Sequence, residues 1–273
     1  MKKSFSSSPL EIASTFWRHR KLILNLTKRE VTGRYKGSLF GMLWSFFNPI
    51  FMLVVYTFVF SFIFNARWST ESTSRAEFAL VLFAGLIIFN FFSECAIKAP
   101  SIILSNVNYV KKVIFPLEIL PIVNACSALF HACISIVVWL LFYTIEAGIP
   151  HLTVMLFPIF ILPLLLFVIG VGWLLSALGV FLRDVGQMIT IIVTALMFLS
   201  PIFYPITAIP EKYRPLLNLN PLAPAISQFR DIFYWGVVPS AGVYISYLAG
   251  CAIFAWFGFV VFQKTRKGFA DVL

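Results

Sequence analysis

The sequence has few of the residues on which enzyme active sites depend. Its three histidines, at positions 19, 131 and 151, are scattered and form no HExxH pair, which argues against a zinc-hydrolase site. No GxxxxGK[ST] phosphate loop occurs, so this chain cannot hydrolyse ATP in the P-loop manner. The predicted loops lack paired carboxylates, which argues against glycoside chemistry. We therefore expect no catalytic residue, no metal site and no cofactor bound by this chain.

The four cysteines carry no metal-binding or redox pattern. They stand at positions 95, 126, 133 and 251, all within predicted membrane spans, and no CxxC occurs. Cysteine in such a setting behaves as a small apolar residue. We expect all four to serve packing.

Charged residues are scarce as well, and this decides the class of protein. Only 12% of the 273 residues are charged, 60% are hydrophobic, and the mean hydropathy is +0.92. Such a composition predicts an all-α integral membrane protein, formed here by a single transmembrane domain over residues 1–273. Runs that are almost free of charge place six expected spans, at 37–66, 78–99, 119–145, 153–182, 185–206 and 239–262.

The distribution of basic residues predicts the orientation. With the N-terminus inside, alternation of the six spans puts 16 of the 21 Lys and Arg residues on the inner face. The net charge of +10 then lies on that face, as the positive-inside rule requires. We expect both termini to be cytoplasmic. The membrane surface accounts for the basic charge, so we expect no nucleic-acid partner.

Two segments outside the spans predict helices at the inner face. "SPLE" at 8–11 matches a capping box, and residues 8–30 separate apolar from basic side chains, which predicts an amphipathic interface helix. The alternative is a solvated basic leader. Between the second and third spans, residues 100–113 predict a short helix that begins at Pro100, through which a cytoplasmic partner could transmit force. The alternative is a simple interfacial connector.

Small residues gather on one face of two spans. The third span carries Ala125, Ala128, Ala132 and Ser135, and the fourth carries Gly172, Ser176 and Gly179. Small faces allow helices to approach closely in lipid. We expect both spans to be packing elements.

Prolines interrupt the chain after the fifth span. Six of them fall within residues 200–224, so this stretch cannot cross the membrane as a regular helix. Irregular backbone at membrane depth is tolerated where protein buries it or where it lines a water-filled cavity. We expect residues 207–236 to form re-entrant short helices at the outer face. A distorted seventh span or a simple outer loop are the alternatives.

Four stretches carry a resemblance to a known family: 26–50 ("LTKREVTGRYKGSLFGMLWSFFNPI"), 89–121 ("FNFFSECAIKAPSIILSNVNYVKKVIFPLEILP"), 182–187 ("LRDVGQ"), and 200–205 with 220–236 ("SPIFYP", "NPLAPAISQFRDIFYWG"). The chain resembles the membrane (permease) subunits of type-2 ABC exporters, in particular the polysaccharide branch of O-antigen (Wzm-like), capsule and teichoic-acid permeases. The resemblance implies a homodimer bound to two copies of a separate ATPase subunit, which would hold the ATP and Mg.

The cargo implied by the resemblance is a lipid-linked polysaccharide, moved from the cytoplasmic side across the bacterial inner membrane. The chain has 31 Phe, 9 Tyr and 7 Trp, whose flat apolar faces suit sugar C–H groups, although we expect most of them to face lipid. Three alternatives stay open. They are a small-molecule, drug or lipid exporter of the same superfamily, a membrane enzyme acting on lipid-linked sugars, and an ion-coupled transporter.

The resemblance also assigns residues to three roles. The residues expected to dock the ATPase are Arg18, Lys21, Asn106, Asn108, Tyr109, Lys111 and Lys112. Those expected to line a channel are Trp44, Phe47, Phe51 and Tyr56 of the first span, with Phe198, Phe203 and Tyr204 of the fifth. Those expected to form the outer gate are Pro201, Pro205, Pro210, Asn220, Pro221 and Arg230.

Overall fold

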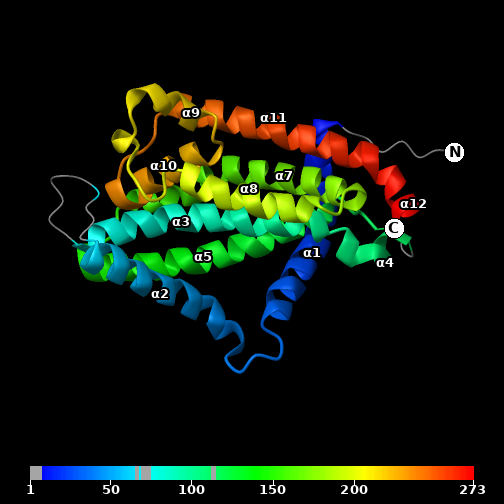
Figure 1. Cartoon of the computed structure of the whole chain (residues 1–273). Coiled ribbons are helices and arrows are strands. Elements are labelled where there is room, and N and C mark those ends of the chain that lie inside the picture. Colours follow the sequence, from blue (N-terminus) through cyan, green and yellow to red (C-terminus); the bar gives the residue numbers. More distant parts are fainter. Residues whose placement is uncertain (1–7, 65–67, 69–74, 112–114) are drawn as a thin grey trace.

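The protein is an elongated bundle of helices. The computed structural model describes residues 8–64, 68, 75–111 and 115–273, and every regular element in these ranges is helical. The long helices lie side by side (Figure 1): α3 (Arg75–Lys98), α5 (Ile119–Ala147), α7 (Leu162–Phe181), α8 (Val185–Leu199) and α11 (Ala241–Thr265). The short helices α4 (Val107–Lys111) and α12 (Phe269–Val272) lie at one end of the bundle, called here the α4 end. The opposite end, near α10 (Leu222–Arg230), is called the α10 end.

The lengths and hydropathies of the helices confirm an all-helical membrane protein. Five segments of the described chain are long and apolar enough to cross a bilayer: Gly41–Phe60, Ala76–Ser101, Ile119–Ala147, Leu152–Phe181 and Ala241–Val272. The apolar helix Val185–Leu199 is shorter. The second of these segments is by far the most buried, since 78% of its most apolar window lies inside the protein. Helix α3 is therefore the central element against which the others pack.

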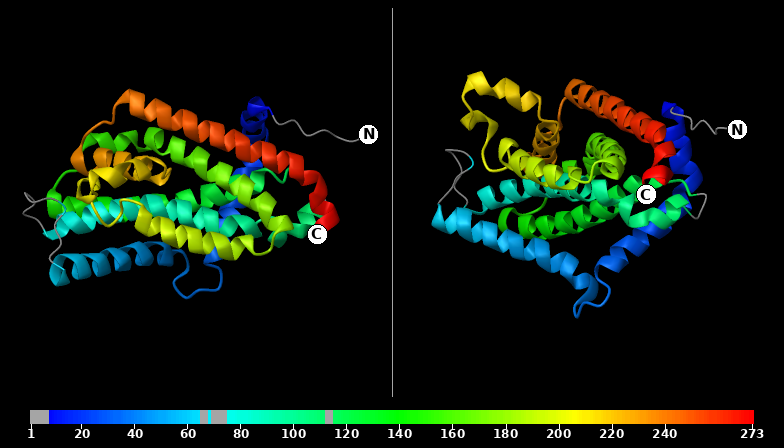
Figure 2. Two further views of the ribbon diagram at one scale, coloured as in Figure 1. Left: turned by 45° about the horizontal axis from the view of Figure 1, so that its top comes forward. Right: turned by 45° about the vertical axis from the view of Figure 1, so that its right-hand side comes forward.

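Helices α1 (Pro9–Arg34) and α2 (Trp44–Tyr56) converge on a vertex at one side of the molecule (Figures 1 and 2), and α1 packs against α5. A 3-10 turn, Gly41–Leu43, leads into α2, which continues as the π-helix Thr57–Ile63. Helix α1 buries Ile23, while its basic side chains face outward. Phe16 of its expected apolar face is 48% exposed, and Trp17 and Leu24 are each 68% exposed, so its position in the membrane interface stays a prediction.

The fifth apolar helix is shorter than the expected span 185–206. Helix α8 ends at Leu199, after 15 residues, which gives a length of about 22 Å against a hydrocarbon thickness of about 30 Å. Pro201 follows two residues later, and a proline removes a backbone donor and disfavours helical geometry in the residue before it.

The chain between α8 and α11 contains only short helices. They are the 3-10 turns Ile206–Ala208 and Glu211–Tyr213, α9 (Arg214–Asn218), α10, and the π-helix Asp231–Trp235. Helix α10 buries Leu222 and Ile226 completely and packs against α3. The expected gate segment 207–236 therefore includes one helix that is part of the protein core.

The connection between α3 and α5, residues 99–118, is not the single helix expected over 100–113. It consists of two 3-10 turns, Ala99–Ser101 and Leu104–Asn106, followed by α4. The side chain of Asn106 donates to the carbonyl oxygen of Ile102 at 2.8 Å. A side chain that bonds to the local backbone in this way competes with the helical ladder. We call the described residues of this stretch, 99–111 and 115–118, the α3–α5 connection.

The fourth expected span, 153–182, is a sequence of three helical pieces. The 3-10 turn Leu152–Leu156 is followed by α6 (Phe157–Phe160) and then by α7. Pro158 and Pro163 stand in the first turns of α6 and α7, the positions at which a missing backbone N–H has no cost.

Candidate functional site

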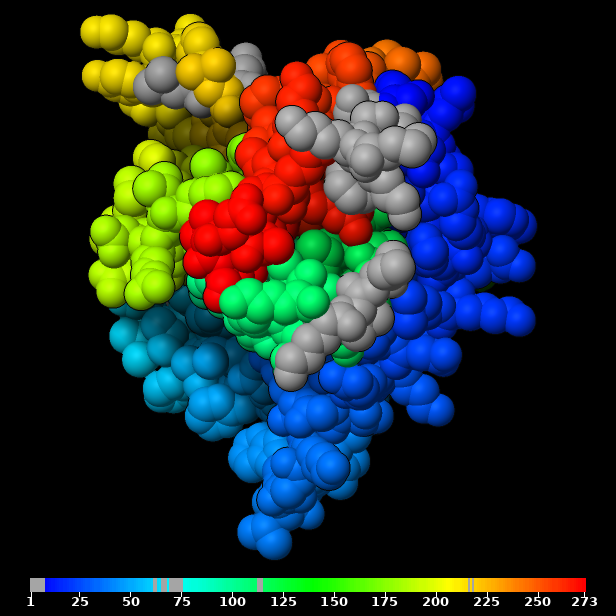
Figure 3. Space-filling view, turned by 90° about the vertical axis from the view of Figure 1, so that its right-hand side faces the viewer, coloured from blue at the N-terminus to red at the C-terminus, as the bar shows by residue number. Residues whose placement is uncertain are grey.

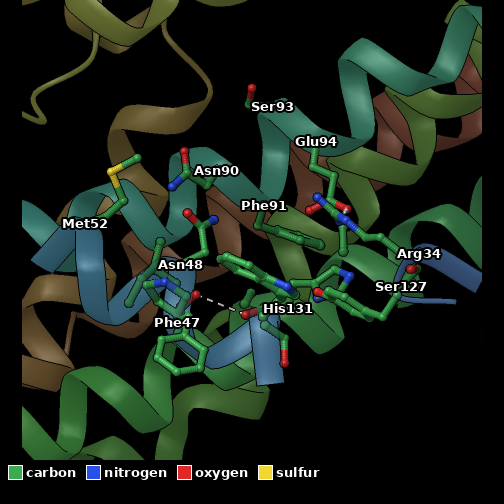
Figure 4. Close-up of a pocket in the computed structure, with 18 of the residues that line it drawn as sticks. Arg34, Phe47, Asn48, Met52, Asn90, Phe91, Ser93, Glu94, Ser127 and His131 are labelled. Carbon is green, nitrogen blue, oxygen red and sulfur yellow. Dashed lines mark hydrogen bonds and ion pairs between the residues drawn. The ribbon is translucent and has the colours of Figure 1, made fainter. Parts of the chain in front are cut away.

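A large cavity lies between α1 and α2 on one side and the flank of the bundle on the other. Its volume is about 1370 Å³, and it is partly open to the surroundings. The lining residues come from the end of α1, from α2, from the second half of α3 and from the middle of α5. Figure 4 shows several of these side chains around the space. Since four helices contribute to it, this cavity is the leading candidate for a substrate site.

One wall of the cavity is aromatic. The four aromatic residues of the first span that were expected to line a channel all lie on it: Trp44, Phe47, Phe51 and Tyr56. Trp44 is 48% exposed and Phe51 is 64% exposed, and the ring centroids of Trp44 and Phe47 lie 6.0 Å apart. The structure thus places all four rings beside the cavity. Their contact with a cargo stays a prediction.

The facing wall, formed by α3 and α5, carries polar side chains among apolar ones such as Ile87 and Phe91, and is called here the polar wall. Its polar side chains recur at helical spacing on two helices: Asn90, Ser93 and Glu94 on α3, and Ser127, His131 and Ser135 on α5. Asn90 is exposed to the cavity, although Phe89 and Phe91 beside it are buried. A polar side chain on a membrane helix is costly unless it meets protein or a water-filled space. These residues therefore favour a cavity that holds water or a hydroxyl-rich molecule.

The small face expected on the third span is largely buried. Ala125, Ala128 and Ala132 are 1%, 1% and 7% exposed and belong to the hydrophobic core, which agrees with the expected packing role. Ala128 and Ala132 also border the cavity, together with Ser135.

Two ion pairs connect α1 to α3 at the cavity. Nη1 of Arg34 lies 2.5 Å from Oε1 of Glu94, and Lys98 pairs with Glu30. All four residues line the cavity, and each side chain is between 27% and 54% exposed. Glu94 and Lys98 stand one turn apart on α3, yet each pairs with a residue of α1. The two pairs fix the end of α1 beside the end of α3.

A further contact joins α1 to α5. The Tyr35 hydroxyl lies 3.3 Å from Nδ1 of His131, within hydrogen-bond distance, and the two rings meet edge to face with centroids 5.9 Å apart. Burial raises the pKa of the Tyr35 phenol above its ordinary value, so the group is neutral and keeps its hydroxyl proton. The end of α1 and the adjoining Tyr35 are therefore bonded to both α3 and α5 at the cavity.

The three aromatic residues expected from the fifth span do not line this cavity. Phe198 is the only one of them on α8, and it stacks on Phe203 with ring centroids 5.9 Å apart. Phe203 in turn lies 6.3 Å from Phe60, and the Tyr204 hydroxyl donates to the carbonyl oxygen of Phe198 at 3.0 Å. Since α8 ends at Leu199, Phe203 and Tyr204 stand in the proline-rich chain beyond it. Phe60 connects this group to the end of the first span.

The elements that carry the described docking residues, α1 and the α3–α5 connection, meet at the α4 end. Figure 3 views this end, on which α1, the α3–α5 connection and the C-terminal residues lie side by side. Arg18 and Lys21 of α1 and Asn108 and Lys111 of α4 are exposed. Arg18 is also 3.8 Å from Glu11. These side chains are available to a partner.

The remaining expected docking residues differ from one another. The Asn106 amide is bonded to its own backbone, as described above. The Tyr109 ring stacks on Phe115 with centroids 4.3 Å apart, so both side chains stabilise the α3–α5 connection. Lys112 lies outside the described residues.

The residues expected to form the outer gate are bonded to one another and to the bundle. The Asn220 side chain donates to Oγ of Ser200 at 2.9 Å and accepts from the backbone N–H of Leu222 at 2.9 Å, so it stabilises the start of α10. The Pro221 carbonyl accepts from the Tyr247 hydroxyl of α11 at 2.8 Å. Pro205 and Pro210 each precede a 3-10 turn.

Arg230 is the most connected residue of this region. Its Nε donates to the carbonyl oxygen of Val81 on α3 at 2.9 Å. Its Nη1 and Nη2 donate to the carbonyl oxygens of Pro201 and Ile202 beyond α8. The guanidinium lies 4.4 Å from the ring centroid of Trp68, and the residue is 5% exposed. Arg230 therefore joins α10, α3 and the proline-rich chain.

The family of the chain follows from comparison with known proteins. Residues 21–234 match the family described as ABC-2 type transporter. The chain belongs to this family. The match extends over α2 to α10 and so includes the cavity, the α3–α5 connection and the gate region.

Several curated proteins are similar to this ABC-2 chain over nearly their whole length. The O-antigen export system permease protein RfbA of Klebsiella pneumoniae is 28% identical over 92% of this chain and 95% of its own length. The O-antigen export system permease protein RfbA of Myxococcus xanthus is 27% identical over 96% of this chain and 99% of its own length. The polysialic acid transport protein KpsM of Escherichia coli is 25% identical over 88% of this chain and 91% of its own length.

Sequence reasoning missed the polar wall of this ABC-2 chain. The signal that could have revealed it is the spacing of polar residues three, four and eight positions apart within apolar spans, which places them on one helical face. Each residue alone, such as Asn90 or Ser127, is unremarkable in a membrane helix. Only their common face points to a cavity.

The ion pairs between α1 and α3 can be tested by a double-mutant cycle on Arg34→Gln and Glu94→Gln. Because both side chains are partly exposed, we expect a coupling free energy of about 0.2–1 kcal/mol that weakens in high salt. Thermal unfolding of the ABC-2 protein in detergent measures it. The pair Arg18 and Glu11 is the control, since its longer separation of 3.8 Å predicts a coupling near zero. Additive effects of the Arg34 and Glu94 substitutions would contradict the assigned pair.

Proposed function

We propose that this chain is the channel-forming permease subunit of an ATP-driven exporter that moves a lipid-linked polysaccharide of the O-antigen type. The cargo passes from the cytoplasmic side across the inner membrane of a bacterium, and both termini lie in the cytoplasm. ATP is hydrolysed by a separate ATPase subunit, which holds the ATP and Mg. The assembly contains two copies of this chain and two of the ATPase.

The observation that supports this cargo is the cavity with one aromatic and one polar wall. A glycan presents apolar C–H faces and many hydroxyl groups. The rings of α2 suit the former, and the amide and hydroxyl groups of α3 and α5 suit the latter. Three similar proteins named above are an O-antigen export permease in two bacteria and a polysialic acid transport protein.

The exposed apolar faces of two helices support a second copy of this chain. The segment Gly41–Phe60, which contains α2, is only 17% buried over its most apolar window, and Val54 of α2, which does not line the cavity, is 60% exposed. On α8, Ile191 is 71% exposed and Met188 is 58% exposed. We assign these faces to contact with the second copy and with membrane lipid, since apolar area in this amount requires a cover other than water.

The basic α4 end supports the ATPase partner. Lys111 of the α3–α5 connection and Arg18 and Lys21 of α1 are exposed, and these two elements lie side by side at this end of the bundle. Basic side chains near the membrane mark the cytoplasmic face, where the ATP is found. A partner that binds here would contact the α3–α5 connection directly.

Deletion of the gene and complementation with variants test the proposal. We expect the deletion strain to lose its surface polysaccharide and to accumulate lipid-linked glycan at the inner face, and the wild-type gene to restore export. Trp44→Ala should restore it incompletely. Loss of one aromatic contact worth about 0.5–1.5 kcal/mol corresponds to a roughly two- to twelvefold weaker interaction with the glycan.

The matched control for this experiment is Trp256→Ala on α11. Trp256 is 44% exposed, close to the 48% of Trp44, and it lies outside the cavity lining. We expect this variant to export as the wild type does, measured as surface glycan per cell at equal protein level. Normal surface glycan in the deletion strain would contradict the proposed function. Equal loss from both variants would contradict the cavity as the glycan site.

A further inference from the structure

Both ends of the α3–α5 connection are bonded to a single helix, α7. At the first end, the Ser176 hydroxyl donates to the carbonyl oxygen of Ala99 at 2.9 Å. At the second end, Nε1 of Trp173 donates to the carbonyl oxygen of Glu118 at 2.8 Å. Ser176 is 0% exposed and Trp173 is 1% exposed. Two donors one turn apart on α7 thus hold backbone atoms that are 19 residues apart along the chain.

Glycines on the same face of α7 let the connection approach closely. A Cβ atom at Gly179 would lie 2.2 Å from the carbonyl oxygen of Pro100, and one at Gly172 would lie 3.0 Å from Cβ of Pro121. The small face predicted on the fourth span is therefore a packing face, and the element that it packs against is the α3–α5 connection together with the start of α5.

Arg266, the residue that follows helix α11, holds the second end of the α3–α5 connection. Nη1 of Arg266 donates to Oε2 of Glu118 at 2.6 Å, and Nη2 donates to the carbonyl oxygen of Phe115 at 2.8 Å. The two charged side chains are only 13% and 11% exposed. A charge-assisted pair that is shielded from water and has further hydrogen bonds is held more rigidly than a surface pair.

The residues after Arg266 are fixed as well. Phe269 of α12 is 0% exposed, with its ring centroid 6.0 Å from that of Phe181 and 5.5 Å from that of Phe262. These contacts fasten the C-terminal turn to the ends of α7 and α11. Arg266 is thus presented to Glu118 from an anchored position.

We propose that Trp173, Ser176, Gly179 and Arg266 form a clamp that makes the α3–α5 connection move as one body with α7 and α11. The clamp residues are positioning residues. When the ATPase displaces the connection, the clamp transfers the displacement to α7 and α11 in addition to the covalently linked α3 and α5. The inference rests on the proposed function, because it requires an ATPase that acts on the connection.

The contact between α7 and α11 agrees with movement as one body. These two helices make the most extensive contact of any pair in the described chain. A Cβ atom at Gly258 of α11 would lie 2.3 Å from the carbonyl oxygen of Gly170 on α7. Backbones in direct contact cannot slide past each other without separating.

The clamp is tested in the purified complex of this chain with its ATPase in lipid vesicles, by the amount of glycan moved per ATP hydrolysed. We expect Ser176→Ala and Arg266→Gln to keep the ATPase bound and hydrolysing ATP but to lower this ratio by at least about fivefold, the lower end of typical coupling between two sites. Arg266→Lys, which keeps the charge, should recover part of the ratio. A loss of stability alone would lower the amount of complex and leave the ratio unchanged.

The matched controls are Ser246→Ala and Arg183→Gln. The Ser246 hydroxyl donates to the carbonyl oxygen of Val243 within its own helix, and Arg183 is an exposed residue between α7 and α8. Both should keep the wild-type ratio. An unchanged ratio in the clamp variants, or release of the ATPase from them, would overturn the clamp. Failure of the wild-type chain to bind an ATPase would instead contradict the proposed function.

Discussion

Replacing Arg230 with methionine is expected to lower the stability of the folded protein more than other single substitutions in the gate region. Three backbone carbonyl groups, those of Val81, Pro201 and Ile202, accept hydrogen bonds from the Arg230 guanidinium. Methionine has a similar length and no donor. Each buried carbonyl that loses its partner costs about 1–3 kcal/mol, so the free energy of unfolding should fall by several kcal/mol, a large fraction of the roughly 5–15 kcal/mol that is typical of folded proteins.

Lysine should not replace Arg230 either. Its ammonium is a single point on a flexible chain, whereas guanidinium presents donors in a planar fork. The three carbonyl groups come from α3 and from the chain beyond α8, and Trp68 covers the guanidinium at 4.4 Å. We expect Arg230→Lys to recover only a small part of the stability and of the export activity.

Thermal unfolding in detergent and surface glycan together measure this effect. The control is Arg214→Met in the same region. Arg214 donates to the carbonyl oxygen of Ile209 at 3.1 Å, but its side chain is 42% exposed and lies 3.6 Å from Glu211, so we expect a change of less than about 1 kcal/mol. Similar unfolding temperatures for the Arg230→Met and Arg214→Met proteins would contradict the assigned role.

The hydrogen bonds of Arg230 can also be perturbed by a substitution at Gly85. A Cβ atom there would lie 2.6 Å from Nη2 of Arg230. Gly85→Ala keeps the guanidinium but pushes it away from Ile202, so it should weaken the gate region by less than the loss of Arg230 does.

The helices of the bundle could be predicted from the sequence, and their ends could be predicted where local signals are strong. The third span, expected at 119–145, is the helix Ile119–Ala147, because a long apolar run between Glu118 and Gly148 leaves few alternatives. The fifth span was predicted too long. Hydropathy counts Pro201 to Ile206 as membrane-compatible, but the helical hydrogen-bond ladder does not survive the prolines.

The partners of buried polar residues could not be predicted. Arg230 was assigned to the gate from the family resemblance, yet its acceptors lie 149, 29 and 28 residues away. Nothing local to residue 230 identifies them. The same holds for Arg266, whose partner Glu118 lies 148 residues away. Such pairs are set by the tertiary packing of helices, which hydropathy and periodicity do not determine.

The cavity was predicted on one side only. The aromatic wall comes from one helix, α2, and its four rings were assigned to a channel from the family resemblance. The polar wall needs the relative rotation of α3 and α5, and the sequence does not give that rotation. The clamp was partly visible, since the small face of the fourth span was predicted to pack closely. The element that this small face packs against, the α3–α5 connection, could not be predicted, because its contacts with α7 depend on tertiary packing.

Adding one methyl group to α11 should lower the stability at one glycine and not at another. At Gly258 a Cβ atom would lie 2.3 Å from the carbonyl oxygen of Gly170 and 3.1 Å from its Cα. The clash is with backbone, which cannot turn aside as a side chain would. We expect Gly258→Ala to separate α7 from α11 and to lower the free energy of unfolding by about 1–3 kcal/mol, the usual cost of overpacking.

Gly250 on the same helix is the matched control. A Cβ atom at Gly250 has open space, with nothing within 4 Å among the described residues. Alanine is the better helix former by up to about 1 kcal/mol, so Gly250→Ala should leave the stability unchanged or raise it. The unfolding temperatures of the two variants in detergent compare them directly. Equal shifts in the same direction would show that α7 and α11 are not in backbone contact at Gly170, and would remove the physical basis for treating these two helices as one moving body.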